Sequence, residues 1–529
     1  RERYTEDVRR ITTLPFQENG VGIIGDKFDQ IAVIELDGVQ QPRILTKGDF
    51  DHARPAWSPD GRHIAFAISR WQPSETADPE RMQIGDIGLI PAEGGAVRRL
   101  TKSVGPAYNP AFAPDGRTIA YIGHARQHGD YTQPSLWLVG VQGGDPRDLT
   151  ARFDRPLGDE SIGDMVGQGQ VTPLPAWAPD GRSVYYLVSD SGMTHLVRIA
   201  TDSGTVAPVA EGQRVIYSFS LSPDGRRAAI CHTDPLTPGD VSVLELGRSV
   251  RERRLTEVNR ALLSGMALAT PERYTFPSGD ATAEGWILRP PERRTAGNTP
   301  AVLEIHGGPM VMYGYRFFFE FQLLAASGIT VVYANPRGSM GYGQAFVAAI
   351  RGDWGNRDFQ DVMNAIDAAV KRGGIDTSRL GIAGGSYGGF MVNWAIGHTD
   401  RFKAAIAMRS ISNQYSMFGT SDFGFADLAD FGGPPWRMPD VYRKQSPISY
   451  VEQVKTPLLM IHSEQDLRTP ISEAEQFYTA LKLLGRDVTL LRYPDENHEL
   501  SRTGQPWHRV HRLEAIVRWF GRRLGGEGL

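Results

Sequence analysis

A serine in the second half of the sequence stands in a setting that suits a nucleophile. Ser386 lies in the run Gly384-Gly385-Ser386-Tyr387-Gly388-Gly389, which directly follows an apolar stretch and precedes a helical one. A Gly-x-Ser-x-Gly turn between a strand and a helix is so tight that small residues must flank the serine, and it exposes the hydroxyl above the sheet. A glycine-rich turn can also bind phosphate, but no lysine follows these glycines as it does in a P-loop. We therefore interpret Ser386 as a nucleophile for acyl transfer.

A serine hydroxyl needs a general base, and the base needs an acid that orients it. Asp466 and His498 each follow a later apolar run, so the chain order is Ser, Asp, His. This is the order expected with a Gly-x-Ser-x-Gly turn. His462 and Glu464 could compete for these roles. We predict that Ser386, Asp466 and His498 converge at one edge of a sheet as a catalytic triad.

The oxyanion formed in acyl transfer needs preorganised donors. The backbone N–H of Tyr387, at the start of the helix, is one candidate. The run His306-Gly307-Gly308-Pro309 follows another predicted strand and corresponds to the HGG-type loop that supplies a second donor. We predict the N–H of Gly308 for this role, with that of Gly307 as the alternative. We expect His306 to pack and hold the loop rather than to act as a base.

Two arginines, Arg337 and Arg409, also follow predicted strands. Guanidinium groups bind carboxylates and peptide carbonyls through paired N–H donors, so both are candidates for substrate binding. The alternative for each is an intramolecular salt bridge that braces a loop. Residues 317–319, three phenylalanines, and Trp394 could line an apolar pocket, but we expect most of them to pack in the core.

The elements that must position these residues alternate between strand and helix from about residue 270 onward. Short apolar runs predict strands over 302–305, 330–333, 380–383, 404–408, 458–461 and 488–491. Apolar residues at helical spacing predict helices over 359–370, 474–484 and 510–520. This alternation predicts a mostly parallel sheet with helices on both faces, whose strand ends carry the chemistry. We assign residues 269–529 to a catalytic domain of the α/β-hydrolase fold.

The first half of the sequence is repetitive instead. A Pro-Asp-Gly-Arg phrase, which is typical of hairpin turns, recurs at residues 59–62, 114–117, 179–182 and 223–226. A weaker echo ending in Leu-Thr closes several of the units. This spacing predicts blades of a β-propeller over residues 1–268, with four to five blades present. A full ring needs more, so either the ring is open or small, or an N-terminal piece is absent from this chain.

With these motifs together, the sequence resembles the prolyl oligopeptidase family, and most closely its acylaminoacyl-peptidase-like branch. The resemblance rests on residues 306–309, 335–343, 352–355 and 384–391 and on the Asp466 and His498 loops. It implies a serine exopeptidase or oligopeptidase whose propeller caps the hydrolase and admits short peptides. Family members of this kind remove N-acylated residues, dipeptides or C-terminal residues. Glu499 is a departure, because the family usually has glycine after the histidine, and we can place no glutamate pair of the kind that dipeptidyl peptidases use.

The composition of the chain limits the classes of partner that it can bind. The 529 residues carry a net charge of −4 without long blocks of one sign, which argues against nucleic acid or an anionic membrane as the main partner. No apolar run is long enough for a membrane span. With a single cysteine, Cys231, we expect no internal disulfide and a cytoplasmic location. We predict no cofactor or metal, a short peptide substrate, and possible association with a second copy or with a missing N-terminal segment.

Two other readings remain. A carboxylesterase shares the same machinery, although ordinary esterases lack a propeller. A non-catalytic propeller interaction protein would require a damaged triad, which the sequence does not show.

Overall fold

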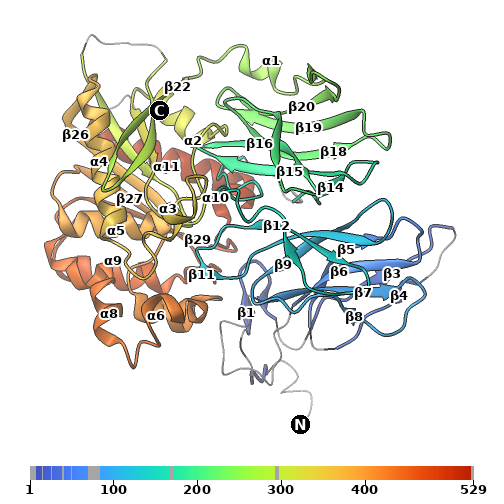
Figure 1. Cartoon of the computed structure of the whole chain (residues 1–529). Helices are drawn as coiled ribbons and strands as arrows, with labels where there is room; N and C mark the ends of the chain where they lie inside the picture. Colours follow the sequence, from blue (N-terminus) through green and yellow to red (C-terminus); the bar gives the residue numbers. More distant parts are fainter. Residues whose placement is uncertain are drawn as a thin grey trace.

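The computed structural model describes residues 8–525 except 13, 15, 25–26, 38–40, 49, 70–83, 166–171 and 292–296, with the backbone alone for 426, 427 and 429. Mostly antiparallel sheets without flanking helices form the first half, in blue to green, and one sheet with flanking helices forms the second, in yellow to red (Figure 1). This confirms the predicted fold class, a β-propeller part followed by an α/β-hydrolase fold.

Four groups of antiparallel strands make up the blades, after two short strand pairs. The last two blades are joined into one eight-stranded sheet by a parallel pairing of Thr194 with Val215. The strand pairs are β1 (Gln17–Glu18) with β2 (Gly22–Ile23) and β3 (Ala32–Val33) with β4 (Arg43–Ile44). The blades are β5 (His52–Trp57), β6 (His63–Ser69), β7 (Gly85–Pro91) and β8 (Arg98–Arg99); β9 (Ala107–Phe112), β10 (Thr118–Gly123), β12 (Ser135–Gly140) and β13 (Arg147–Asp148); β14 (Ala176–Trp177), β15 (Ser183–Asp190), β16 (Met193–Ala200) and β17 (Val206–Ala210); and β18 (Val215–Leu221), β19 (Arg227–Asp234), β20 (Thr237–Glu245) and β21 (Arg251–Arg254). The short strand β11 (Gln127–Asp130) leaves the second blade between β10 and β12.

The repeated phrases have a structural role in each blade. Every Pro-Asp-Gly-Arg phrase forms the turn between a blade's first two strands, where the aspartate carboxylate accepts a hydrogen bond from the arginine N–H two residues on. The glycine takes φ between 66° and 69° in all four turns, which a side chain would disfavour. The threonine of the weaker echo accepts a backbone N–H from the neighbouring strand, as Thr101 does from Ile87 at 3.0 Å.

One eight-stranded sheet organises the second half, in the order β22-β23-β25-β24-β26-β27-β28-β29. It is parallel from β25 onward and antiparallel at β22 and β23. Its strands are β22 (Pro271–Ser278), β23 (Ala281–Leu288), β24 (Thr299–Ile305), β25 (Thr330–Asn335), β26 (Ile375–Ser386), β27 (Ala404–Ser410), β28 (Leu458–Ser463) and β29 (Val488–Tyr493). The boundary that the sequence predicts after residue 268 falls between β21 and β22.

Helices cover both faces of this sheet, because neighbouring side chains of each strand point to opposite sides. Leu303 of β24 packs with α4 (Arg357–Lys371), α5 (Tyr387–His398) and α9 (Ser472–Leu483). Val302 packs with α2 (Phe319–Ala326) and α11 (Pro506–Leu524) on the other face. The remaining helices are short: α1 (Arg260–Leu263), α3 (Gln344–Ala348), α6 (Gln414–Thr420), η4 (Gly424–Asp427), α7 (Leu428–Phe431), α8 (Pro439–Lys444), η5 (Pro447–Gln453) and α10 (Leu500–Thr503).

The two halves meet through backbone hydrogen bonds as well as side chains. Met312, shortly after β24, donates to the carbonyl of Glu160 at 2.9 Å and accepts from the N–H of Ile162 at 3.0 Å. Tyr315 donates to the carbonyl of Gly192, in the β15–β16 turn, at 2.9 Å. The propeller half is therefore tied to the segment that follows the HGG-type loop.

Candidate active site

Ser386 ends β26, and α5 begins at the next residue. Its backbone has φ 62° and ψ −123°, a combination that residues with a side chain rarely adopt. The flanking glycines are required by close contacts: a Cβ on Gly384 would lie 2.7 Å from the Gly388 backbone, and a Cβ on Gly388 would lie 2.1 Å from the Ile305 carbonyl oxygen. The strand-to-helix turn therefore has the geometry that the sequence predicts for a nucleophile elbow.

Asp466 and His498 lie on the loops after β28 and β29, and the structure brings them into contact. His498 Nδ1 is 2.8 Å from Asp466 Oδ2, and both side chains are buried. Asp466 also accepts hydrogen bonds from the N–H of Arg468 at 3.0 Å and from the N–H and hydroxyl of Thr469 at 2.8 and 3.0 Å. Because an ionised carboxylate only accepts, the imidazole donates from Nδ1, which leaves Nε2 as the basic nitrogen.

Burial and charge shift the pKa values of this pair. Burial lowers the pKa of His498, and this outweighs the opposite effect of the Asp466 carboxylate. Burial alone would raise the pKa of Asp466, but the charge and hydrogen bond of His498 outweigh it and hold that pKa below its usual range. At neutral pH the pair therefore consists of a carboxylate and a neutral imidazole, the state that general-base catalysis needs.

Thr469 is the residue that links the surroundings of Ser386 and His498. Thr469, whose hydroxyl is 3.2 Å from His498 Nδ1, lines the same pocket as Ser386. In the part of the chain that the structure describes, no hydrogen bond joins Ser386 to His498. Catalytic hydrogen bonds of substrate-free enzymes are often long and tighten when substrate binds.

The backbone groups expected to hold the oxyanion also line this pocket, namely Tyr387 and Gly308. Tyr387 is the first residue of α5, so its N–H has no partner within the helix. Gly308 has φ 107°, a conformation that favours glycine. Gly307 lies beside Ser386, since a Cβ on it would be 3.3 Å from Ser386 Cβ.

His306 is buried, and both of its ring nitrogens have polar partners. Its Nε2 lies 2.9 Å from Ser339 Oγ and its Nδ1 2.6 Å from the Gly307 carbonyl oxygen. Burial lowers the pKa of His306 to about 4. The side chain ties the HGG-type loop to the loop after β25, in line with a packing role.

Apolar side chains form most of the lining of the Ser386 pocket. Tyr131, from the propeller half, forms part of its wall, and its hydroxyl accepts a hydrogen bond from Trp354 Nε1 at 2.7 Å. The other apolar or aromatic lining residues are Pro309, Met310, Trp354, Tyr387, Ile411, Phe423 and Phe431. Trp394 instead packs in the core, and neither it nor residues 317–319 line this pocket.

Comparison with known proteins agrees with this geometry. The sequence model of the prolyl oligopeptidase family matches residues 315–527. The uncharacterized peptidase YuxL of Bacillus subtilis is 38% identical over 516 residues, which are 97% of this chain and 77% of YuxL. The chain belongs to the prolyl oligopeptidase family. The predictions of this family and of a serine peptidase are thereby confirmed.

Two further similarities narrow the branch. The uncomplexed acylaminoacyl peptidase of Pyrococcus horikoshii superposes with a TM-score of 0.82 at 27% identity, covering 99% of this chain and 79% of that chain. Dipeptidyl-peptidase 5 of Porphyromonas gingivalis is 30% identical over 453 residues, which are 84% of this chain and 63% of that protein. The structural similarity shows that the chain is an acylaminoacyl-peptidase-like member of the family, while dipeptidyl peptidases are also among its relatives. The chain spans only part of the length of these relatives.

The two arginines that the sequence offers as candidates for substrate binding lie in different surroundings. Arg337 is buried and forms a two-pronged ion pair with Asp361, at 2.8 and 2.9 Å. This geometry favours the bracing role over substrate binding. Arg409 lies behind the elbow against Gly385 and donates to Ser501 Oγ at 3.0 Å. Burial and the nearby Arg502 lower the pKa of Arg409 to about 10.

Glu499, the departure from the family pattern, forms an ion pair with Arg502 and leaves the Asp466–His498 bond intact. Burial alone would raise the pKa of Glu499, but Arg502 outweighs burial and holds that pKa at about 2. The competing candidates do not replace Asp466: His462 Nε2 lies 2.7 Å from the Thr469 carbonyl oxygen, and Glu464 pairs with Arg492 on the surface.

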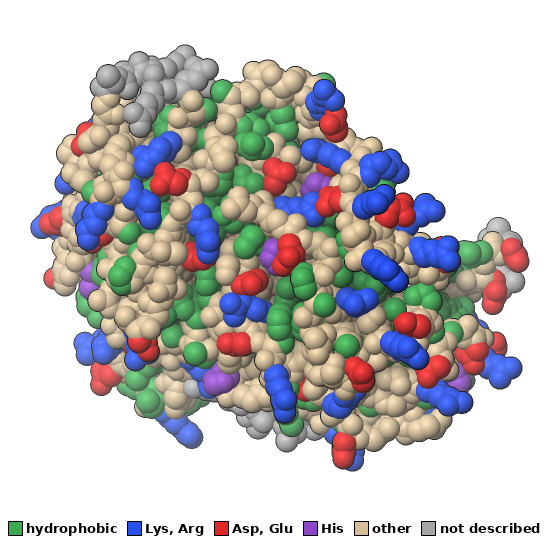
Figure 2. Space-filling model, turned by 45° about the horizontal axis from the view of Figure 1, so that its top comes forward, with side chains coloured by type: hydrophobic (Ala, Val, Ile, Leu, Met, Phe, Trp, Pro, Cys, Tyr) green, Lys and Arg blue, Asp and Glu red, His purple; other side chains and the backbone are tan. Residues whose placement is uncertain are grey.

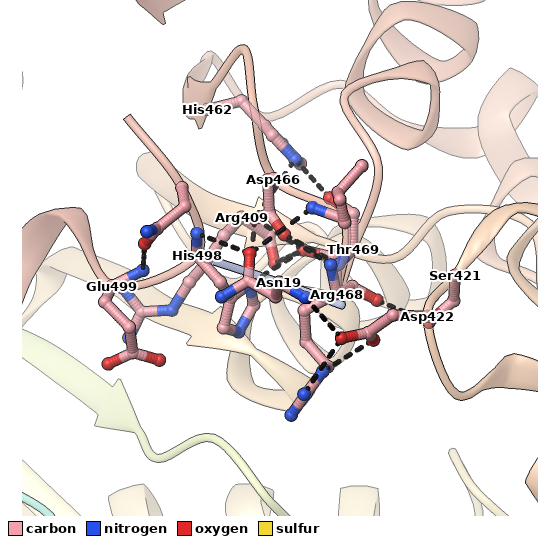
Figure 3. A network of polar contacts seen from close by, with 12 residues as sticks. Asn19, Arg409, Ser421, Asp422, His462, Asp466, Arg468, Thr469, His498 and Glu499 are labelled. Carbon is pink, nitrogen blue, oxygen red and sulfur yellow. Dashed lines mark hydrogen bonds and ion pairs between the residues drawn. The ribbon is translucent and has the colours of Figure 1, made fainter. Parts of the chain in front are cut away.

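Besides Tyr131 of the pocket wall, sequence reasoning missed Arg468, Thr469 and Asn19 near the site. Arg468 forms two hydrogen bonds to Asp422, at 2.8 and 3.0 Å, and its side chain is 43% exposed (Figure 3). Arg468 and Thr469 lie two and three residues after Asp466 in the same loop, so their closeness in sequence to a predicted site residue could have indicated them. Asn19 carries no motif and is far away in the sequence.

Proposed function

We propose that the protein hydrolyses short peptides through an acyl-enzyme formed on Ser386. The observation that carries this proposal is the Asp466–His498 pair, at 2.8 Å, beside the pocket that contains Ser386 at its strained turn. Asp466 orients the imidazole, and His498 is the general base and acid.

The proposed reaction proceeds in two balanced halves. Ser386 Oγ attacks the carbonyl carbon of the peptide bond, and its proton passes to His498 Nε2. The N–H groups of Tyr387 and Gly308 bind the oxyanion. The C–N bond breaks as the imidazolium returns the proton to the leaving amine, which leaves an ester on Ser386. Water then attacks this ester, its proton passes to His498 and on to Ser386 Oγ, and the acid product leaves.

We assign the Ser386 pocket to the side chain that precedes the cleaved bond. Its walls are mostly aromatic or aliphatic, which supports an apolar or aromatic residue at this position. A related acylaminoacyl peptidase, 27% identical, has been solved with Z-Gly-Gly-Phe-chloromethyl ketone, which carries phenylalanine at its reactive end. Arg468 is a further candidate for contacting the peptide, because its guanidinium lies over the ring of Phe423, which lines the pocket.

We propose that the amino end of the substrate is blocked. Among the described residues that line the Ser386 pocket, the one acidic side chain is Asp430, and it is paired with Arg351 at 2.6 Å. This leaves no free carboxylate in that lining to bind an α-amino group. A carboxypeptidase is the second candidate, because Arg409 lines a neighbouring cavity with Gly307 and Gly385 and pairs there with a hydroxyl rather than a carboxylate.

A comparison of kcat/KM on three substrates tests this function: an acetyl-phenylalanine anilide, an unblocked dipeptide anilide and a nitrophenyl ester. We expect the blocked anilide to be cleaved faster than the unblocked one. Turnover of the ester alone would identify an esterase, and preference for the unblocked dipeptide would identify a dipeptidyl peptidase. Loss of activity in Arg409→Lys on free-acid peptides but not on amidated ones would identify a carboxypeptidase.

We propose a cytoplasmic location and no nucleic-acid or membrane partner. Cys231 is the single cysteine, and it is a free thiol. On the face shown in Figure 2, basic and acidic side chains are interspersed, which supports a surface without a concentrated basic patch there. No helix within the described ranges has the length and apolarity to cross a bilayer. Association with a second copy or with a further N-terminal segment remains part of this proposal.

A further inference from the structure

A hairpin near the start of the chain reaches the loops that carry Asp466 and His498. Strands β1 and β2 pair through residues 17–18 and 22–23, and Asn19 is the first residue of the turn between them. Gln17 Nε2 donates to the Thr420 carbonyl oxygen at 2.7 Å, so the hairpin rests on the hydrolase half.

Asn19 contacts both loops at once (Figure 3). Its side-chain Oδ1 accepts hydrogen bonds from the N–H of His498 at 3.1 Å and from the N–H of Leu467 at 3.3 Å. Its own N–H donates to Asp422 Oδ2 at 2.9 Å. Leu467 directly follows Asp466, so a single amide oxygen bonds to the histidine backbone and to the residue beside the aspartate.

The Asn19 side chain joins the two loops near their tips, where few other hydrogen bonds connect them. Nearer the strand ends the loops bond to each other directly, for example from the Gln465 N–H to the Glu496 carbonyl oxygen at 2.9 Å. At the tips, the Asp466–His498 bond and the bond of the Thr469 hydroxyl to His498 are the other hydrogen bonds between described residues of the two loops. A displacement of about 1 Å in a reacting group can cost on the order of 100-fold in rate.

We infer that Asn19 is a positioning residue that holds the His498 loop in register with the Asp466 loop. It touches neither substrate nor the reacting atoms, and it acts through the backbone N–H groups of His498 and Leu467. The acid–base pair is thus assembled partly by the N-terminal half of the chain. The inference rests on the proposed role of His498 as the base.

The test compares Asn19→Ala, Asn19→Asp and Gln17→Ala in the full chain. The readouts are kcat and KM on a blocked anilide and the rate of Ser386 phosphonylation by a fluorophosphonate. Asn19→Ala should lower kcat and the phosphonylation rate together by about 10- to 100-fold, with KM within roughly twofold of wild type. Asn19→Asp keeps an acceptor oxygen and should recover most of both rates.

Gln17→Ala is the matched control, because it removes the hairpin's contact with Thr420 and leaves the Asn19 bonds. It should keep wild-type rates. Equal losses in Gln17→Ala and Asn19→Ala, a phosphonylation rate of Asn19→Ala within twofold of wild type, or failure of Asn19→Asp to exceed Asn19→Ala would each overturn the inference. Thermal unfolding of each variant confirms that the measured protein is folded.

Failure of the proposed function gives a different result. If the wild type cleaves no anilide but Ser386 is phosphonylated, the peptidase assignment fails, and the phosphonylation rates of the three variants still decide the role of Asn19.

Discussion

At the residue scale, the surroundings of His498 determine the pH range in which the proposed reaction can occur. Burial lowers its pKa, and the charges of Arg409 and Arg502 act in the same direction, while Asp466 opposes them. Catalysis needs the neutral imidazole, so activity should be lost as the pH falls through this lowered pKa. Glu499 partly offsets the two arginines by pairing with Arg502.

We predict that the acid limb of the kcat/KM profile lies below pH ~6.5, the ordinary pKa of histidine. Arg502→Gln removes a positive charge near His498 and frees the Glu499 carboxylate, so it should move this limb to higher pH. Arg518→Gln, which breaks an exposed pair with Glu514, is the matched control and should not move it. An unchanged or lower limb in Arg502→Gln would contradict this electrostatic account.

A second prediction at this scale concerns the ion pair between Arg337 and Asp361, in which both side chains are buried. Arg337→Ala leaves a carboxylate uncompensated and should lower the free energy of unfolding by about 3–5 kcal/mol in urea titrations. The double variant Arg337→Met with Asp361→Asn should regain part of this loss and keep kcat/KM per folded molecule. A double variant that is stable but no longer cleaves peptides would show that Arg337 binds substrate after all.

At the scale of elements, the propeller half supports the segment that follows the HGG-type loop. Met312, four residues after Gly308, exchanges backbone hydrogen bonds with the segment at residues 160–162. Gly192 and Gly314 pass so closely that a Cβ on Gly314 would lie 1.8 Å from the Gly192 carbonyl oxygen. The β15–β16 turn therefore supports the segment that follows the HGG-type loop.

Gly314→Ala should separate these two segments, since the clash is with backbone that cannot rotate away. We expect a lower melting temperature and a lower kcat, measured on the blocked anilide. Gly265→Ala is the matched control, because no heavy atom lies within 4 Å of its added Cβ. A melting temperature and a kcat equal to those of the wild type in Gly314→Ala would contradict the conclusion that the β15–β16 turn supports the segment after the HGG-type loop.

At the scale of the whole molecule, local signals predicted the architecture, and long-range contacts escaped prediction. The Pro-Asp-Gly turns and the glycines around Ser386 follow from local conformation, so the blades and the elbow could be predicted from the sequence. Tyr131 and Asn19 reach the site only through the packing of one half on the other, and neither has a motif. Arg337 shows the same limit, because its position after a strand fits both a substrate contact and the ion pair that the structure contains.

The contribution of Tyr131 to the Ser386 pocket also predicts a limit on substrate size, because the propeller half forms part of the pocket wall. A blocked peptide of a few residues should be cleaved, and the same sequence within a loop of a folded protein should not. Mass spectrometry of both digests provides the measurement. Equal cleavage of the two would contradict a capped site.

The most direct test of Ser386 as the nucleophile is to identify the residue that a fluorophosphonate modifies. Intact mass and peptide mapping of the full chain should show one adduct, on the peptide that contains Ser386. Ser386→Ala should give none, and Asp466→Asn should form the adduct more slowly because its imidazole is no longer held in the basic tautomer. A folded wild-type protein without an adduct, or an adduct that persists in Ser386→Ala, would contradict the account.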